Sequence, residues 1–210
     1  MTVEYEQIKE KFLSGTSDGC EVFFEKNGFY TEAGYCYIIL DELEKARDMF
    51  TRASISDIRG HWGLVLLQML AGKVTLNPTY FEIRNFLELD LSIFIKYYKA
   101  EYINEILKFS DFMAYYNPET FKYLGRAFWA NNFIPAAMFF LRKAKDKFYN
   151  DPELHYLIAY IAYHNDKDFK QAEKSLKTCL EILPEYAPAI ALQKAIRNLE
   201  IRKKFITKRL

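Results

Sequence analysis

The chain has 210 residues, of which 50% are hydrophobic and 17% aromatic, a composition that excludes a disordered protein. Its 29 basic and 28 acidic side chains leave a formal charge of +1, so the chain as a whole has no field that would draw it to nucleic acid or to a membrane. Only 8 glycines and 6 prolines are present, which disfavours a fold of short strands and tight turns and favours helices.

The cysteines and the N-terminus indicate a cytoplasmic protein with reduced thiols. The 3 cysteines form no CxxC pair, and the first residues are acidic and polar, without the basic start and apolar run of a signal peptide. The most apolar stretch, residues 62–72, is far shorter than the roughly 20 residues of a membrane span. We expect it to be a buried helix.

Taken in chain order, the sequence predicts helices throughout. Residues 1–26 are expected to form two short capping helices, Glu4–Leu13 and Cys20–Lys26, around the loop SGTSDG. Residues 27–60, 118–151 and 152–186 are each expected to form a pair of antiparallel helices. Residues 61–117 are expected to be divergent helical repeats, and residues 187–210 a C-terminal capping helix.

Three segments share one spacing of large and small residues. An aromatic residue, a small pair and a second aromatic residue describe one face of a first helix, and after a fixed interval a small, a large and a small residue describe the facing side of a second helix. A Gly or Ala lets two helix backbones approach, and a large side chain of the partner fills the adjoining space. The segments are Tyr30, Ala33, Gly34, Tyr37, Ala46, Phe50 and Ala53; Phe121, Leu124, Gly125, Phe128, Ala137, Leu141 and Ala144; and Tyr156, Ala159, Tyr160, Tyr163, Ala172, Leu176 and Cys179.

Turn chemistry separates these helices. Asp41-Glu42, Asn131-Asn132 and Asn165-Asp166 are each placed to end one helix and to cap the next. Asn117-Pro118 and Asp151-Pro152 offer an N-cap followed by a proline at the first helical position.

The pattern resembles the tetratricopeptide repeat, a unit of about 34 residues with the signature W-x2-L-G-x2-Y…A-x3-F…P. Ala46-x3-Phe50, Leu124-Gly125 and the late Pro184 match it. The resemblance implies an all-α fold, an α-solenoid of antiparallel helix pairs wound into a right-handed superhelix. Residues 61–117 depart from the repeat: we expect a helix from Trp62, a second from Tyr80 to Leu89, and a truncated pair, Leu91–Tyr98 and Tyr102–Tyr116.

The sequence offers no motif for catalysis or metal binding. His61, His155 and His164 are not spaced as metal ligands, and the sequence contains neither a nucleophile elbow nor a glycine-rich phosphate loop. We therefore expect no enzyme activity, no cofactor and no small-molecule substrate.

The resemblance implies a concave groove that binds a segment of another protein, as in an adaptor, assembly factor or chaperone. We expect an apolar or amphipathic segment, with Trp129 and Tyr35 as anchors and Lys122 with Arg126 supplying orientation. The predicted groove residues are Thr31, Tyr35, Ile38, Leu67, Lys122, Arg126, Trp129, Leu157, Ile161 and His164.

Two alternatives stay open at this point. The groove residues could be core, with the groove filled by the middle helices or by a second copy of the chain through self-association. The basic C-terminal helix could instead bind nucleic acid or an anionic membrane surface. Its basic residues are Lys194, Arg197, Arg202, Lys203, Lys204, Lys208 and Arg209.

Overall fold

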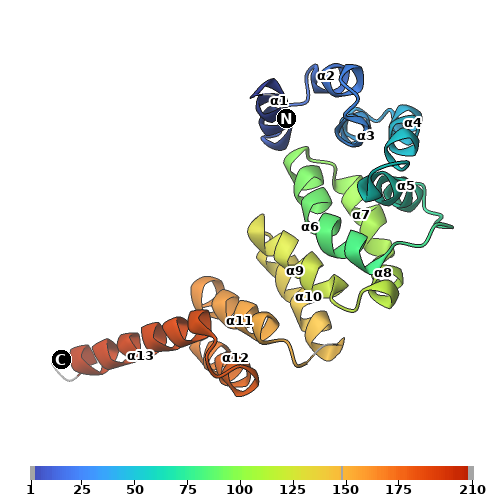
Figure 1. Ribbon diagram of the computed structural model, residues 1–210. Helices are drawn as coiled ribbons and strands as arrows, with labels where there is room; N and C mark the ends of the chain where they lie inside the picture. Colours follow the sequence, from blue (N-terminus) through green and yellow to red (C-terminus); the bar gives the residue numbers. More distant parts are fainter. Residues whose placement is uncertain (1–2, 148, 208–210) are drawn as a thin grey trace. The chain divides into compact units, whose positions relative to one another are not determined.

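The computed structural model describes residues 3–147 and 149–207, and this part of the chain is helical without a strand (Figure 1). The chain divides into two compact units, residues 1–123 and residues 124–210, called unit 1 and unit 2 below. The boundary falls inside one helix. The expectation of an all-α protein is therefore confirmed.

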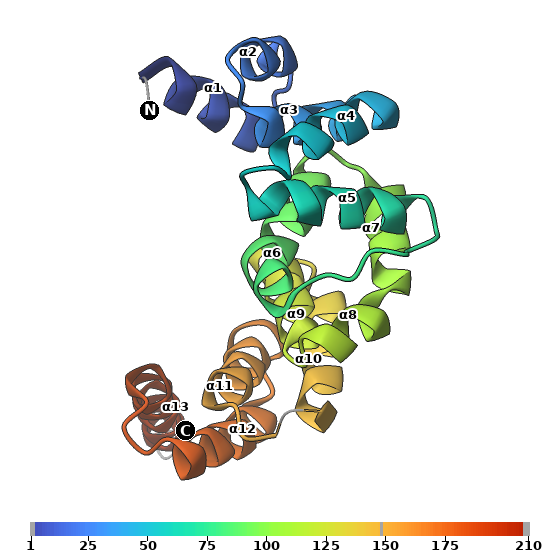
Figure 2. The ribbon, with the colours of Figure 1, turned by 45° about the vertical axis from the view of Figure 1, so that its right-hand side comes forward.

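Eight helices and the first residues of a ninth belong to unit 1 (Figures 1 and 2). They are α1 (Val3–Leu13), α2 (Cys20–Lys26), α3 (Tyr30–Ile39), α4 (Leu43–Ala53), α5 (Ile58–Leu70), α6 (Tyr80–Lys96), α7 (Ala100–Lys108), α8 (Ser110–Tyr116) and the start of α9 (Thr120–Ala130). Helices next to each other in sequence pack together, as α2 does on α3, α3 on α4 and α4 on α5. The two predicted N-terminal helices are confirmed as α1 and α2.

Unit 2 holds the rest of α9 and the helices that follow it. They are α10 (Ile134–Lys147), α11 (Pro152–Ile161), the π-helix η1 (Ala162–Asp166), α12 (Phe169–Ile182) and α13 (Ala187–Thr207). Again each helix packs on its neighbour in the chain: α10 on α11, α11 on α12 and α12 on α13.

Small residues lie where two helices cross, as their spacing predicts. A Cβ atom added to Gly34 on α3 would lie 2.6 Å from the Phe50 ring of α4. A Cβ atom added to Gly125 on α9 would lie 2.6 Å from Cγ of Leu141 on α10. Each glycine therefore faces the large residue that the pattern assigns to the second helix, and in these two hairpins the predicted crossing is confirmed.

The third segment keeps the same core but changes its turn. Ala159, Ala172, Leu176 and Cys179 are buried in one cluster, and Tyr160 packs beside them where the first two segments have glycine. The predicted break at Asn165-Asp166 is wrong, because η1 continues the helix through these residues. The left-handed residue that ends it is Lys167, with φ 57°, whereas Asp41 and Asn132 end the first helices of the other two hairpins.

The middle of unit 1 also differs from expectation. We predicted one helix ending at Leu89 and another starting at Leu91, but α6 runs unbroken from Tyr80 to Lys96. Asp90, the polar residue at the expected break, is fully buried and accepts a hydrogen bond from the Trp62 indole, so the helix continues through it as part of the core. The predicted helix 102–116 is divided instead, between α7 and α8 at Phe109.

The C-terminal helix closes the core of unit 2. Ala189, Leu192 and Ile196 of α13 pack in the same buried cluster as Cys179 of α12. The predicted basic residues at 208 and 209, and the side chains from residue 200 onward, lie outside the described residues. Within the described part of the chain, none of the helices combines the length and the apolar character that crossing a membrane requires.

Candidate partner-binding surface

The ten residues predicted to line a groove fall into two groups. Seven are buried: Thr31, Tyr35, Ile38, Leu67, Lys122, Leu157 and Ile161. Arg126 and Trp129 are partly exposed, His164 is exposed, and all three belong to unit 2. These seven side chains do not lie at the surface as predicted, because they pack in the core.

Helix α6 covers the face of unit 1 on which the groove was expected. The Trp62 indole Nε1 on α5 donates to Asp90 Oδ2 on α6 over 2.5 Å. The Arg59 guanidinium lies 5.4 Å from the ring centroid of Tyr35 on α3 and 5.5 Å from that of Phe86 on α6. Four apolar side chains of α6 are fully buried, namely Ile83, Leu87, Leu91 and Phe94. The chain's own middle helix thus fills this space.

Asp90 is the polar centre of this packing. Burial raises the pKa of the Asp90 carboxyl to about 7, and the neighbouring Trp62, Tyr35 and Arg59 offset part of the rise. The Tyr35 hydroxyl and Asp90 Oδ1 are buried without a hydrogen bond of good geometry in the described structure. Burying the charged carboxylate with one oxygen unpaired costs free energy, and this cost favours the protonated form of Asp90 near neutral pH.

Unit 2 carries a connected row of partly exposed aromatic rings, called the aromatic row below and made of Trp129, Tyr160, Tyr156 and Tyr186. The centroids of Trp129 and Tyr160 lie 5.5 Å apart, those of Tyr160 and Tyr156 6.0 Å, and those of Tyr156 and Tyr186 5.6 Å. The rings come from α9, from α11 and from the turn before α13. Aromatic rings with one side covered and one in water are typical anchors of protein interfaces.

His164 extends the row beyond the end of α11. The ring centroids of His164 and Tyr160 lie 4.2 Å apart. The Lys167 ammonium donates to the His164 carbonyl oxygen over 2.7 Å. Partial desolvation and the charge of Lys167 lower the pKa of His164, so this imidazole is neutral at pH 7. The exposed cation at this end of the row is therefore Lys167.

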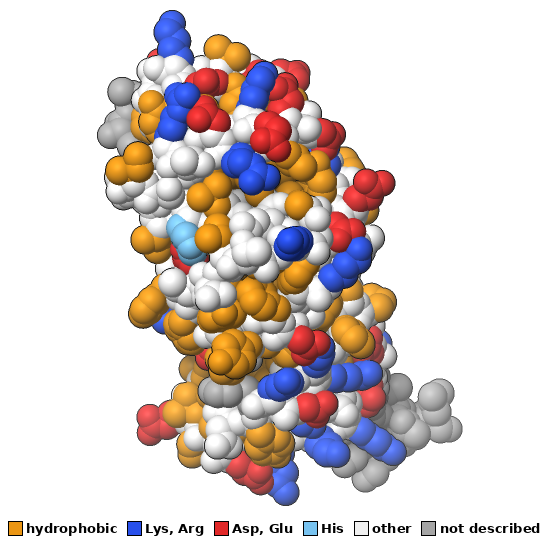
Figure 3. All heavy atoms as spheres, turned by 90° about the vertical axis from the view of Figure 1, so that its right-hand side faces the viewer, with side chains coloured by type: hydrophobic (Ala, Val, Ile, Leu, Met, Phe, Trp, Pro, Cys, Tyr) orange, Lys and Arg blue, Asp and Glu red, His pale blue; other side chains and the backbone are white. Residues whose placement is uncertain are grey.

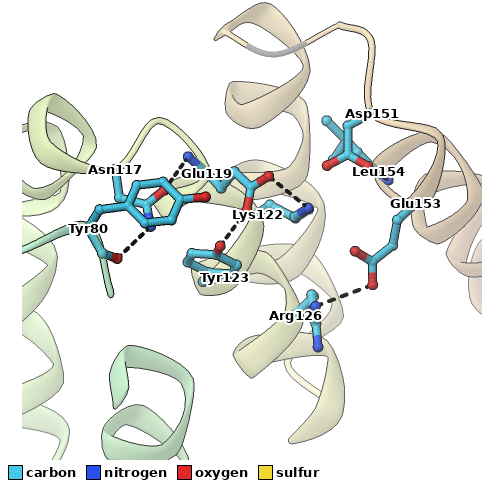
Figure 4. Close-up of polar contacts among 9 residues, drawn as sticks. All are labelled: Tyr80, Asn117, Glu119, Lys122, Tyr123, Arg126, Asp151, Glu153 and Leu154. Atoms are coloured by element: carbon cyan, nitrogen blue, oxygen red, sulfur yellow. Dashed lines mark hydrogen bonds and ion pairs between the residues drawn. The ribbon is translucent and has the colours of Figure 1, made fainter. Parts of the chain in front are cut away.

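An ion pair flanks the other end of the row. Arg126 Nη1 on α9 lies 3.2 Å from Glu153 Oε1 at the start of α11, and both side chains are 38% exposed (Figure 4). Arg126 and Trp129 are three residues apart and therefore share a face of α9. Glu153, Tyr156 and Tyr160 share a face of α11 by the same rule.

Lys122 does not belong to this surface. It is buried, its ammonium lies 3.6 Å from Glu119 Oε1, and it stands 5.9 Å from the ring centroid of Tyr123 (Figure 4). The neighbouring Asn117 donates to the Tyr80 carbonyl oxygen over 3.1 Å. The predicted basic pair is thus divided, since Lys122 serves the packing of unit 1 and Arg126 flanks the aromatic row.

A second concave surface of unit 2 follows α10. This α10 groove encloses about 580 Å³, and its lining residues are Ile134, Pro135, Met138, Phe139, Arg142, Lys143, Asp146 and Asp166. Phe139 is 61% exposed, so it offers an apolar side chain outside the aromatic row and serves below as a control.

The sequence contains a signal for part of the aromatic row. Tyr156, Tyr160 and Tyr163 follow each other at intervals of four and three, which predicts one helix face but not whether that face is core or surface. Tyr186 was not predicted, because the turn before α13 has no pattern that would bring it to Tyr156.

The chain matches no protein-family model, no curated protein and no solved structure in our searches. Among the described residues, no group of three His, Cys, Asp or Glu side chains is placed to hold a metal ion.

Proposed function

We propose that the protein is a non-enzymatic, tetratricopeptide-like solenoid that binds an apolar or amphipathic segment of another protein on the aromatic row. The solenoid part is supported by the recurring spacing of small residues and by helix pairs that pack mainly on their neighbours in the chain. The binding part is supported by the row itself.

The observation that carries the proposal is that the rings of the aromatic row touch each other and remain partly exposed. Three elements, α9, α11 and the turn before α13, hold them, so the rings are fixed before a partner arrives. A rigid aromatic surface loses little conformational entropy on binding and gains from the water released by an apolar partner side chain. Adaptors and chaperones that hold a partner segment need such a surface.

The test is capture of the partner and titration with matched variants. The partner is captured from an extract of the source cells on the immobilised protein, purified and titrated calorimetrically. Trp129→Ala with Tyr156→Ala should weaken binding by roughly 30-fold or more, the loss that corresponds to about 2 kcal/mol at an interface hot spot. Phe139→Ala, in the α10 groove, should leave the affinity within about twofold.

Circular dichroism of each variant checks that the fold is intact. If Phe139→Ala abolishes binding and the double variant does not, the α10 groove is the binding surface and the proposal is wrong. If neither variant changes the affinity, the partner binds neither the aromatic row nor the α10 groove, and the proposal is again wrong.

A further inference from the structure

The near-neutral charge of the chain hides a strong difference between the two units. Residues 1–123 hold 13 basic and 19 acidic side chains, a net charge of −6, and residues 124–210 hold 16 basic and 9 acidic ones, a net charge of +7. Most of the excess of unit 2 comes from its C-terminal segment, where residues 187–210 hold 7 basic and 1 acidic side chain. Residues 124–186 hold 9 basic and 8 acidic side chains and are nearly neutral.

Basic side chains on the helices of unit 2 are exposed to solvent. Lys170, Lys174 and Lys177 lie along one face of α12, and all three are exposed. Figure 3 shows exposed Lys and Arg side chains interspersed with Asp and Glu side chains. The net positive charge that residues 187–210 give to unit 2 raises the association rate of a negatively charged partner and disfavours a positive one.

The aromatic row has a cation near each end. Arg126 lies beside Glu153 at the start of α11, and Lys167 follows η1 at its other end. The 12 residues from Glu153 to His164 extend over roughly 16 Å at the rise of a helix. About five residues of an extended segment cover that length.

We infer that the partner segment is acidic as well as apolar: aromatic or aliphatic side chains pack on the aromatic row, and carboxylates on both sides of them reach Arg126 and Lys167. The inference rests on the proposed function and adds the chemistry of the partner. The Arg126 guanidinium has five N–H donors in a planar fork, so it can bind a partner carboxylate while it keeps Glu153.

The ring geometry favours a polypeptide over a single-stranded nucleic acid. Bases bind by stacking on open ring faces. In the row, neighbouring rings meet at interplanar angles of 72°, 56° and 66°, so the edge of one ring covers part of the face of the next. Such a surface leaves few open ring faces for stacked bases, whereas aliphatic and aromatic side chains can pack against ring edges as well as faces.

A second copy of the chain is a weaker candidate, although its unit 1 is acidic. Acidic residues of unit 1 already pair within the unit, as Asp48 does with Arg52 at 2.7 Å and Asp41 with Lys99 at 2.7 Å. We therefore assign the row to a segment of a different protein.

The experiment selects binders from a phage-displayed library of random 16-residue peptides on the full chain. The clones are then screened against Trp129→Ala with Tyr156→Ala. Clones that need the row should be enriched in Asp and Glu around apolar residues. If clones need the row but show no acidic enrichment, the charge inference is wrong and the proposed function stands. If no clone depends on the row, the proposed function is wrong.

Three charge variants test the pairing with a selected acidic peptide. Arg126→Gln with Lys167→Gln should weaken binding about tenfold, and should have little effect on the same peptide with its acids changed to amides. The matched control, Lys170→Gln with Lys174→Gln, removes the same charge from α12 and should change the affinity by less than about threefold. An equal loss of affinity in both double variants would show that the peptide is attracted by the overall positive charge and not by direct ion pairs. That result would overturn the assignment to Arg126 and Lys167.

Glu153→Gln is the third variant, and we expect it to change the affinity for the acidic peptide in the opposite direction. It removes a competing carboxylate from Arg126, so the acidic peptide should bind severalfold more tightly, a gain that a merely structural ion pair would not produce. Weaker binding would contradict the inference. The other occupants are tested directly: row-dependent binding of oligo(dT), or a concentration-dependent dimer lost in Trp129→Ala, would replace the acidic segment by nucleic acid or by a second copy.

Discussion

The buried carboxyl of Asp90 makes a sharp prediction about how stability depends on pH. Asp90 is 0% exposed, and its pKa in the folded chain is about 7, compared with an ordinary value of 3.8. Between these two values the folded chain keeps a proton on Asp90 that the unfolded chain has released. Its contribution to stability is therefore fully present below pH 4 and is lost as the pH rises toward 7.

The size of the effect follows from the shift. A difference of about three pKa units corresponds to about 4 kcal/mol, since one unit is worth about 1.4 kcal/mol. Asp90→Asn keeps an oxygen acceptor for the Trp62 indole and adds an amide donor that can reach the Tyr35 hydroxyl, but it never carries a charge. The variant should be more stable than the parent by up to about 4 kcal/mol at pH 8, and by much less at pH 5.

Urea unfolding followed by tryptophan fluorescence measures this difference. In a Trp129→Phe background the remaining indole is Trp62, so the signal reports the unit that contains Asp90. Asp48→Asn is the control, because Asp48 forms an exposed pair with Arg52 on α4 and should contribute less than about 0.5 kcal/mol at either pH. A gain that is equal at pH 5 and pH 8, or a loss at pH 8, would refute the reasoning.

Three further stability predictions follow from close packing and buried polar contacts, each measured as a change in the free energy of unfolding. Gly125→Ala should cost about 1–3 kcal/mol, although helix propensity alone favours alanine, and adding Leu141→Ala should cost less than the sum of the two changes because the new methyl group fills part of the space. Gly60→Ala should cost more than Gly125→Ala, since its Cβ would meet the backbone of Ser54, which cannot rotate away; an equal cost would contradict this. Asn117→Ala should cost about 1–3 kcal/mol, because this fully buried side chain donates to the Tyr80 carbonyl and caps the Glu119 N–H; a neutral change would show that water replaces both bonds.

Contacts within one hairpin could be predicted because they depend on spacing alone. Gly34 meets Phe50, and Gly125 meets Leu141, at intervals that the helix period and a short turn fix without reference to the rest of the chain. Helix starts such as the one at Asp151, whose side chain accepts from the Leu154 N–H, depend on equally local chemistry.

The candidate surface could be predicted only in part, because exposure depends on what covers a helix from outside its own hairpin. Tyr35 and Trp129 both lie on the face of a first helix that was predicted to line the groove, and the sequence predicts both as anchors. In the structure Tyr35 is 1% exposed beneath α6, whereas Trp129 remains partly exposed. The pattern of Tyr35 contains no information on where α6, some 50 residues later, will pack.

The sequence by itself determined the all-helical class, the hairpins around Gly34 and Gly125 and most helix ends, because these follow from interactions over a few residues. Only the tertiary structure decided that α6 fills unit 1, that Asp90 is buried with a raised pKa and that the rings of the aromatic row stay partly exposed. The physical reason is that desolvation of a side chain is set by all the elements packed around it, and those elements come from distant parts of the chain.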